Sequence, residues 1–375
     1  MRRFNRILVL HVIAAAGLLV ATESNATQYL ITDLGTLGSG LNSSPGWTKS
    51  VNNRGEVAGY SNYNSSFNAT HAFRYSHGVL HDLGTLTPPG AVAGGSYSRA
   101  YNLNDAGVVV GYSFFQSGST EPAHPVVFDL DGTITDLGTF RPGNNGNGEA
   151  HIINNYGVVV GQAASGADGS INYLPFILYP GSKTLISLGS LGGTRGKAYG
   201  LNDRNEVVGW SFIAGDAASH AYLYSRGAMT DLNPALAANI AGATGSEAWD
   251  INNRGIIAGT VFAAAGNHAV VYGNGQVFDL GFLSGGNSAQ AEGINDRDQI
   301  VGNSVVSEVT GTTHAFLYER GVMCDLNSLV LNISGWELED APAISNSGYI
   351  TGSGKINGAT HAFLLTPVGD GPSCK

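Results

Sequence analysis

The sequence predicts an all-β protein, a seven-bladed β-propeller built from four-stranded antiparallel blades. Three observations carry this prediction: an excess of glycine, a unit repeated seven times, and short extended runs within each unit. Glycine accounts for 54 of the 375 residues, about twice its usual share of roughly 7%. Because glycine costs ~1 kcal/mol per helical residue relative to alanine, this composition disfavours a mainly helical protein. The hydrophobic content of 43% is too high for a disordered chain.

The first 26 residues have the three parts of a secretory signal peptide. Three arginines stand near the start, residues 7–20 form an apolar run, and small residues occupy positions 24 and 26. The apolar run has ~14 residues, short of the ~20 that span a bilayer. We therefore expect cleavage after Ala26 and secretion to the periplasm or the medium, rather than an uncleaved membrane anchor. No later stretch predicts a membrane span.

The charge pattern argues against two kinds of partner. The chain carries a net charge of −10, which becomes −12 once residues 1–26, with three arginines and one glutamate, are removed. An acidic chain with scattered charges lacks the basic patch that nucleic-acid binding requires. We expect neither a nucleic-acid partner nor attraction to an anionic membrane.

One unit recurs seven times along the chain. Residues 103–113 represent its first motif, and the copies follow one another at intervals of 43–52 residues. A second motif, usually led by histidine, follows each copy, and a third motif of the type Asp-Leu-Gly also occurs seven times. Four short extended runs per unit at this period are typical of a propeller blade. The copies are anchored at Asn52, Asn104, Asn154, Asn202, Asn252, Asn295 and Ser345.

The four extended runs of a unit, which we call strands A to D, are separated by turns. The A–B turn ends in glycine in five units and in Asn205 and Asp298 in the other two. Asparagine and aspartate tolerate the left-handed backbone best after glycine, so this position requires that conformation. Strand B holds a glycine that no copy replaces, which predicts a β-bulge or the close approach of a neighbouring blade. These glycines are Gly59, Gly111, Gly161, Gly209, Gly259, Gly302 and Gly352.

The ends of the array predict a closed ring. After the leader, the chain begins with a D-type strand at residues 29–34 and ends with a C-type strand at residues 361–365. The N-terminal strand is therefore expected to complete the last blade, which removes an open sheet edge. An open β-solenoid is the alternative. The predicted organisation is a signal peptide (1–26), a single propeller domain (27–368) and a short tail (369–375).

The motifs resemble a known family. Residues 33–38, 103–113 and 314–318 are similar to the tandem segments of the extracellular HAF repeat family of bacterial exported proteins. The similarity covers nearly all of residues 29–365. It implies an exported repeat protein and no particular activity. Family members often end in a sorting signal with a hydrophobic helix and a basic tail, and residues 369–375 do not have this character, so release to the periplasm or medium is expected.

Six of the ten histidines begin the second motif, and an aspartate begins the third motif in the same units. Across a two-residue turn, the two side chains lie diagonally on one sheet face, within reach of each other. We expect one structural hydrogen bond in each of six blades, rather than metal binding or proton chemistry. The pairs are His71–Asp82, His124–Asp136, His220–Asp231, His268–Asp279, His314–Asp325 and His361–Asp33.

One column of residues differs between the units. It lies three residues before each anchor on strand A, the innermost strand, where it could surround the mouth of a central channel. A binding site needs unlike groups, whereas a scaffold repeats itself, so this column is the candidate ligand site. The alternative is that these side chains fill gaps between blades of unequal size. The candidates are Lys49, Tyr101, His151, Tyr199, Trp249 and Glu292, with Pro342 in the last unit.

Signs of catalysis are weak. The sequence has no G-x-S-x-G elbow, no H-E-x-x-H motif and no cysteine–histidine cluster with zinc spacing. The regular aspartates are explained by the repeat, and residues 296–298 match a calcium loop poorly. We predict no catalytic residue, metal or cofactor. Cys324 and Cys374 are the two cysteines, and in an oxidising compartment they would form a disulfide or remain unrelated thiols.

These observations favour an exported, monomeric binding module for an extracellular glycan or peptide. The connections B–C and D–A are long and rich in small polar residues, which places the expected binding face on their side of the propeller. The low share of charged residues, 12%, indicates a polar and weakly charged ligand. Two alternatives stay open: a propeller hydrolase or lyase acting on polysaccharide, and a purely structural surface protein.

Overall fold

The computed structural model describes residues 26–38, 43–45, 50–62, 70–86, 97–114, 122–141, 146–166 and 172–372. These residues form an all-β structure, as the glycine content and the repeats predicted. The helices of this part of the chain are single turns: η2 (Ala214–Asp216), α1 (Asn233–Ala237) and η3 (Leu326–Ser328). None of the described helices has the length and apolar character needed to cross a membrane.

Four of the sheets consist of four consecutive antiparallel strands each. In each of these sheets the strands lie side by side in the order in which they occur in the chain. Their bounds are β2 (Ser43–Pro45), β3 (Val57–Asn62), β4 (Thr70–Ser76) and β5 (Val79–Gly84); β6 (Ser98–Leu103), β7 (Val109–Phe114), β8 (Ala123–Phe128) and β9 (Ile134–Asp136); β18 (Ala243–Ile251), β19 (Ile257–Ala263), β20 (His268–Gly273) and β21 (Gln276–Asp279); and β22 (Ala289–Ile294), β23 (Ile300–Ser307), β24 (Thr312–Glu319) and β25 (Val322–Asp325).

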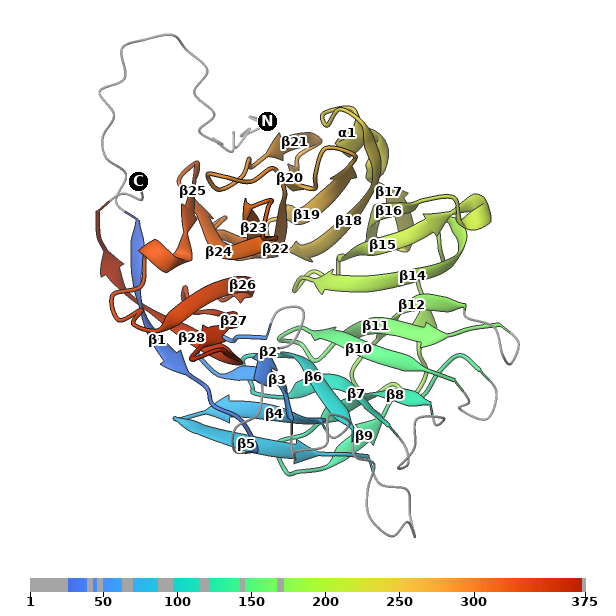
Figure 1. Ribbon diagram of the computed structural model, residues 1–375. Helices are drawn as coiled ribbons and strands as arrows, with labels where there is room; N and C mark the ends of the chain where they lie inside the picture. The colour runs from blue at the N-terminus through green and yellow to red at the C-terminus, as the bar shows by residue number, and fades with distance from the viewer. Residues whose placement is uncertain are drawn as a thin grey trace, which may run out of the picture.

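A fifth four-stranded sheet joins the two ends of the chain. Strand β1 (Thr27–Asp33) pairs antiparallel with β28 (Ala359–Asp370), which continues to β27 (Ile350–Ile356) and β26 (Trp336–Ile344). Asp33 lies opposite Phe363 in this register. Figure 1 shows the blue first strand beside the red last strands. The N-terminal strand therefore occupies the D position beside a C-type strand.

The remaining eight strands form one sheet, and this corrects the expectation of seven separate blades. The structure has five separate four-stranded sheets, and in the sixth a single parallel pair, Tyr173–Arg195, joins two runs of four. Only four residues, 188–191, separate β13 from β14, so β14 begins early and Arg195 in its first half pairs with Tyr173 of β12. The strands are β10 (Gly148–Ile153), β11 (Val159–Ala164), β12 (Tyr173–Leu178), β13 (Ile186–Ser187), β14 (Gly192–Leu201), β15 (Val207–Ile213), β16 (Ser219–Ser225) and β17 (Ala228–Asp231).

The sheets are arranged around a common centre, in chain order, which is the architecture of a β-propeller (Figure 1). The first strand of each run lies nearest the centre, and we call β6, β10, β14, β18, β22 and β26 the inner strands. Apolar residues from neighbouring sheets pack together between them. One such cluster joins Val208 of β15 to Ile257 of β19 and Val270 of β20. Since burial of apolar surface stabilises by roughly 25 cal/mol per Å², adjacent sheets hold each other in place.

Each inner strand contains a β-bulge, and the bulge explains the glycines of strand B. In β6 the register shifts between Ala100 and Asn102. A Cβ atom on Gly111, the partner of Ala100, would lie 1.9 Å from the carbonyl oxygen of Arg99. The same contact would measure 2.0, 1.9, 2.5, 1.9 and 2.0 Å at Gly161, Gly209, Gly259, Gly302 and Gly352. Of the two reasons predicted for this glycine, the structure has the bulge.

The A–B turns adopt the left-handed backbone that their sequences predicted. Gly255 has a φ of +81°, and Asn205 and Asp298, which stand in for glycine, both have a φ of +59°. Each turn therefore leaves its inner strand in the same direction. This common geometry brings the seven turns together at one end of the propeller axis.

Candidate functional site

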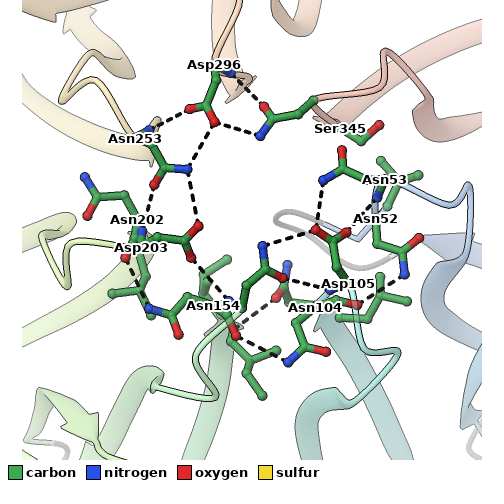
Figure 2. Close-up of a pocket in the computed structure, with 18 of the residues that line it drawn as sticks. Asn52, Asn53, Asn104, Asp105, Asn154, Asn202, Asp203, Asn253, Asp296 and Ser345 are labelled. Atoms are coloured by element: carbon green, nitrogen blue, oxygen red, sulfur yellow. Dashed lines mark hydrogen bonds between the residues drawn. The ribbon is translucent and has the colours of Figure 1, made fainter.

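The anchor residues of the seven A–B turns form a ring at one end of the axis, shown in Figure 2. In six turns the asparagine Oδ1 accepts the backbone N–H groups two and four residues ahead, at 3.0–3.1 Å. The asparagine Nδ2 donates to the anchor carbonyl of the next turn, at 3.0–3.3 Å. One side chain thus closes its own turn and links it to its neighbour.

The residues that follow the anchors make a second circuit. They alternate between amide and carboxylate, and five amide-to-carboxylate hydrogen bonds of 2.7–3.3 Å join them. In six of them the backbone N–H donates to the side-chain oxygen of the equivalent residue in the next turn. In the last turn the N–H of Ser347 donates to Asn53 Oδ1 at 3.0 Å. We call the anchors and these residues together the turn ring. The second set is Asn53, Asp105, Asn155, Asp203, Asn253, Asp296 and Asn346.

The turn ring surrounds a hollow of about 610 Å³ that is open to solvent. Its polar groups point toward one another and bond to one another (Figure 2). The residues nearest the axis are repeated from turn to turn, and their hydrogen-bonding capacity is used within the ring. The arrangement is that of a scaffold, and the residue types that the sequence marks as variable lie elsewhere.

The variable column coincides with the bulges of the inner strands, and we call it the bulge column. Lys49 lies outside the described residues. The rings of the next members form one series, with centroids 5.5 Å apart from Tyr101 to His151, 5.3 Å from His151 to Tyr199 and 4.6 Å from Tyr199 to Trp249. The last two rings are stacked, with an angle of 10° between their planes. The structure therefore brings the predicted residues of four neighbouring inner strands together.

One half of the bulge column is buried and internally satisfied. Tyr101 is 6% exposed and His151 is 3% exposed. His151 contacts Glu149 at 2.9 Å and the carbonyl of Ala198 at 2.7 Å, and Gln162 donates to Glu149 at 3.0 Å. Burial opposes the ionisation of Glu149, but the hydrogen bond and charge of His151 outweigh it and lower its pKa to about 2. This half fills space between sheets, as the alternative reading of the column predicted.

The other half of the column lies beside carboxyl groups that form no ion pair with the described residues. The amide of Asn303 donates to Glu292 at 2.7 Å and to Asp340 at 3.1 Å, which ties a residue of β22 to a residue of β26. Burial and the charge of Asp340 raise the pKa of Glu292 well above its usual value. Burial also raises the pKa of Asp340. Both side chains are only half-buried, so this pair remains in contact with solvent.

Glu247 and Trp249 lie on β18, next to this pair along the ring of inner strands. Glu247 has no hydrogen-bond partner for its carboxylate among the described residues. Burial raises the pKa of Glu247 to about 7, against the opposing charge of Lys197. Trp249 is half-buried and donates from its indole N–H to Thr260 at 3.2 Å. We call Glu247, Trp249, Glu292, Asn303 and Asp340 the acidic site.

Sequence reasoning identified Trp249 and Glu292 of this site and missed Glu247, Asn303 and Asp340. A signal for Glu247 was present: the residue two before each column position is charged in four consecutive units (Arg99, Glu149, Lys197 and Glu247). Asp340 stands at the same position, two residues before Pro342, although Gln290 interrupts the charged series. Asn303 follows Gly302 on strand B, at a position that every unit has, and nothing in the sequence distinguishes it from its equivalents.

The six histidines of the second motif all contact the aspartates of the third. In each pair the histidine Nδ1 lies 2.6–3.0 Å from a carboxylate oxygen. The His361–Asp33 pair joins β28 to β1, across the two ends of the chain. Most of these aspartates also accept the backbone N–H two residues ahead, for example Gly281 N–H to Asp279 at 3.0 Å. The contacts connect strands C and D far from the bulge column.

Two further sequence predictions concern single sites. Cys324 is buried and disulfide-bonded. Cys374 lies outside the described residues, so the pair itself stays a prediction. Within the part of the chain that the structure describes, no group of three or more histidine, cysteine, aspartate or glutamate residues could hold a metal ion.

Comparisons with known proteins point to the fold. No protein-family model matches this sequence, and no curated protein matches it. An oligogalacturonate lyase solved in complex with manganese is similar in structure, with a TM-score of 0.55 and 9% identity over 92% of this chain and 94% of that chain. A prolyl endopeptidase structure has a TM-score of 0.55 and 8% identity over 91% of this chain and 50% of that chain. The β-propeller domain of the Trilobed protease from Pyrococcus furiosus has a TM-score of 0.48 and 11% identity over 72% and 77% of the two chains.

Proposed function

We propose that the propeller has seven blades and is closed by its N-terminal strand. The eight-stranded sheet then counts as two blades, because a single residue pair, Tyr173–Arg195, joins its halves. The circuit of seven turns supports this count, since the N–H of Ser347 in the last turn donates to Asn53 in the first. The antiparallel pairing of β1 with β28 supports closure. We expect the closed ring to be a monomer.

We propose that this protein is exported and that its acidic site binds a glycan. The observation that carries the proposal is the position of Trp249 two residues from Glu247 on β18, the inner strand next to that of Glu292. These carboxyl groups are partly exposed and form no ion pair with the described residues. Sugar rings place C–H groups on an aromatic face and donate hydroxyl hydrogen bonds to nearby acceptors, so an indole beside carboxyl groups suits them.

Glycan binding fits better than the other partners considered. The chain is acidic overall and offers no basic patch for nucleic acid. Because burial raises the pKa of Glu247 to about 7 and that of Glu292 well above normal, the site is less charged at neutral pH than its composition indicates. A weakly charged site matches a neutral polyhydroxyl ligand. The resemblance to the HAF repeat family supports export.

The test is a binding screen of purified residues 27–375 on glycan and peptide panels. We expect a glycan to be retained and Trp249→Ala to lower its affinity at least tenfold. Tyr156→Ala is the matched control, because this aromatic residue is 69% exposed on an A–B turn away from the acidic site. Retention of peptides alone would replace the glycan by a peptide ligand. Binding that Trp249→Ala leaves unchanged would move the site elsewhere, and no ligand at all would favour the purely structural surface protein.

A second candidate function, glycoside hydrolysis, is favoured by the Glu292–Asp340 pair. Two neighbouring carboxyl groups with raised pKa values can share one proton. In hydrolysis, the protonated group donates its proton to the glycosidic oxygen as the carbon–oxygen bond breaks. The other, as a carboxylate, removes a proton from the water whose oxygen forms the new bond to carbon. The asparagine amide between them, Asn303, would hold both groups in place.

This candidate is tested by the release of reducing ends from a polysaccharide panel. If it is right, Glu292→Gln and Asp340→Asn each lower turnover at least 100-fold and leave binding within a few fold. Glu339→Gln is the matched control, because Glu339 lies on the same strand and pairs with Lys355 instead. Binding without turnover in the unaltered protein would reject hydrolysis and leave the binding module.

A further inference from the structure

The first residue after the predicted leader is anchored on a buried carboxylate. The backbone N–H of Thr27 donates to Glu319 Oε1 at 2.7 Å, and the Thr27 hydroxyl donates to Oε2 at 3.2 Å. Glu319 lies at the end of β24, in the neighbouring sheet, and is 6% exposed. The contact therefore joins the start of β1 to a different sheet, 292 residues away in the chain.

Glu319 has no cation beside it. Its third hydrogen bond comes from Gln299 Nε2 at 2.8 Å, and among the described residues no lysine, arginine or histidine forms an ion pair with it. Arg297 reaches it only indirectly, because Arg297 Nε donates to Gln299 Oε1 at 3.1 Å. A buried carboxylate without a counter-ion is costly even when its hydrogen bonds are satisfied. The carboxylate of Glu319 thus has hydrogen-bond donors but no positively charged partner among the described residues.

We propose that hydrolysis of the Ala26–Thr27 peptide bond supplies the missing cation, so that the α-ammonium group of Thr27 becomes the counter-ion of Glu319. The inference rests on the export proposed above and on no property of the acidic site. In this step water adds across the C–N bond. Its oxygen goes to the Ala26 carbonyl carbon, which leaves as a carboxylate, and the Thr27 nitrogen takes protons to become an ammonium group. The nitrogen that already lies 2.7 Å from Glu319 then carries a positive charge.

The site of this ion pair gives it a structural consequence. β1 is held on one edge by β28 and on the other by Val330, through the parallel bridge at Tyr29. Asn332 adds hydrogen bonds to both the N–H and the carbonyl of Ile31. An ammonium at Thr27 fixes the free end of the strand that joins the two ends of the chain. The precursor, which keeps a neutral peptide nitrogen there, lacks this attachment.

The matched comparison is residues 27–375 with a free Thr27 amine and the same chain with that amine acetylated. The acetyl group reproduces the Ala26 carbonyl, which accepts the Gly371 N–H at 2.8 Å, and it keeps a nitrogen–hydrogen donor for Glu319. The two chains therefore differ in the charge at Thr27 and in the acceptor for the Gly371 N–H, and the second difference is unaffected by a change at Glu319. We expect the free chain to unfold at a temperature roughly 2–4 °C higher at pH 6.5. Equal unfolding temperatures would overturn the proposal.

Glu319→Gln in both chains provides the control, because it removes the negative partner and keeps a similar shape. We expect the difference between free and acetylated chains to disappear in this variant. A difference that persists in Glu319→Gln would assign the effect to something other than this pair and reject it.

The pH dependence adds a second signature. The pair raises the pKa of the amine in the folded state above its unfolded value of about 7.7–8. The extra stability is therefore complete below that value and is lost as pH rises through the folded pKa. Burial and the charge of Glu319 raise the pKa of the neighbouring Tyr29 further above this window. An advantage of the free chain that does not shrink between pH 6.5 and pH 10 would contradict the ion pair.

The processing step is tested separately by the intact mass of the exported protein. We expect a mature chain that begins at Thr27. A different first residue would overturn the assignment of the cation to Thr27, whatever the acetylation experiment shows. Neither measurement involves a ligand, so the outcome is independent of glycan binding at the acidic site.

Discussion

The turn ring and the bulge column lie a few residues apart on the same inner strands and follow opposite rules. In the turn ring, the side chain at every anchor is asparagine or serine, and six of the seven make the same bonds. In the bulge column, the side chain changes from tyrosine to histidine, tryptophan and glutamate. The ring uses its polar groups on itself, whereas the carboxyl groups of the acidic site form no ion pair with the described residues. Repetition here accompanies a network of internal hydrogen bonds, and variation accompanies the proposed binding site.

The physical basis of the difference is the bulge. At a regular position each side chain must fit the equivalent residues of the neighbouring units, so the same residue types recur from turn to turn. The bulged residue is an extra residue without a partner in the ladder, and its side chain is free to vary. The glycine opposite the bulge makes this possible in every unit, because its missing Cβ leaves room for a carbonyl oxygen. Four predictions, ordered from the largest expected effect to the smallest, test this distinction.

Gly209→Ala should have the largest effect, because it removes the room that the bulge of β14 needs. Its Cβ would lie 1.9 Å from the carbonyl oxygen of Lys197, and backbone cannot move aside as a flexible side chain can. We expect no folded protein, measured by soluble yield and by far-ultraviolet circular dichroism. Gly227→Ala is the control: it has a φ of +83° and open space around its Cβ position, so a cost of only ~1–2 kcal/mol is expected. A folded Gly209→Ala protein would reject the bulge explanation.

Asn252→Ala should be next, because it opens the turn ring at one position. Asn252 is 1% exposed. Its amide donates to the carbonyl of Asn295 and to Asp298, and its Oδ1 accepts two backbone N–H groups. Leaving these buried partners unsatisfied should cost about 2–4 kcal/mol in chemical denaturation. Asn239→Ala, at an exposed asparagine that bonds within its own helical turn, should change stability by less than ~0.5 kcal/mol. Equal losses of stability in the two variants would show that the hydrogen bonds of the turn ring do not stabilise the protein more than an exposed side-chain contact does.

The two regions should also differ in the sign of a pH effect. Because the pKa of Glu247 is raised to about 7 in the fold, the folded protein binds a proton that the unfolded chain releases near pH 4.5. Stability is therefore lost as pH rises from about 5 to 8, and Glu247→Gln should recover on the order of 2 kcal/mol at pH 8.

Glu206, beside the turn ring, is the matched opposite. Burial opposes its ionisation, but hydrogen bonds from Asn202 and Arg204 outweigh burial and lower its pKa. Its contribution is present above its unfolded pKa and lost as pH falls through the lower folded value. Glu206→Gln should therefore destabilise the protein at pH 8 and have no effect in strong acid. Unfolding curves of both variants from pH 3 to 9 provide the measurement, and the same sign in both would contradict the distinction.

Asp279→Asn should have the smallest effect. It weakens the His268–Asp279 contact of 2.8 Å, whose partners are both partly exposed. Exposed pairs of this kind typically contribute up to ~1 kcal/mol, so the unfolding temperature should fall by only a few degrees. A loss of stability comparable to that of Asn252→Ala would show that the His–Asp pairs stabilise the protein more than their exposure predicts.

The fold was largely predictable because its constraints are local and repeated. Seven copies of one turn, each with glycine, asparagine or aspartate where φ is positive, indicate a common geometry without any structure. The His–Asp spacing across a short turn likewise places both side chains on one sheet face. The merging of two runs into an eight-stranded sheet was not predictable, because it depends on where β14 begins relative to β12, and a single residue pair decides it.

The acidic site was only partly predictable, because its members come from four strands in three sheets. Glu292 and Trp249 were visible as unlike residues in a regular column. Asn303 joins Glu292 to Asp340; each of these residues has a regular position in its own unit, but no pattern in the sequence shows that Asp340 of one unit contacts Asn303 of another. Likewise, no pattern in the sequence connects Thr27 to Glu319.

The sequence by itself determined the all-β class, the repeated unit, the left-handed turns and the glycines that accompany the bulges, because each depends on neighbours within one unit. The tertiary structure alone decided which column residues are buried and which keep solvent contact, and which carboxyl groups have a cation. Those outcomes depend on how neighbouring sheets pack around the axis. Burial and charge pairing are properties of groups brought together from distant units, and the chain order does not encode their distances.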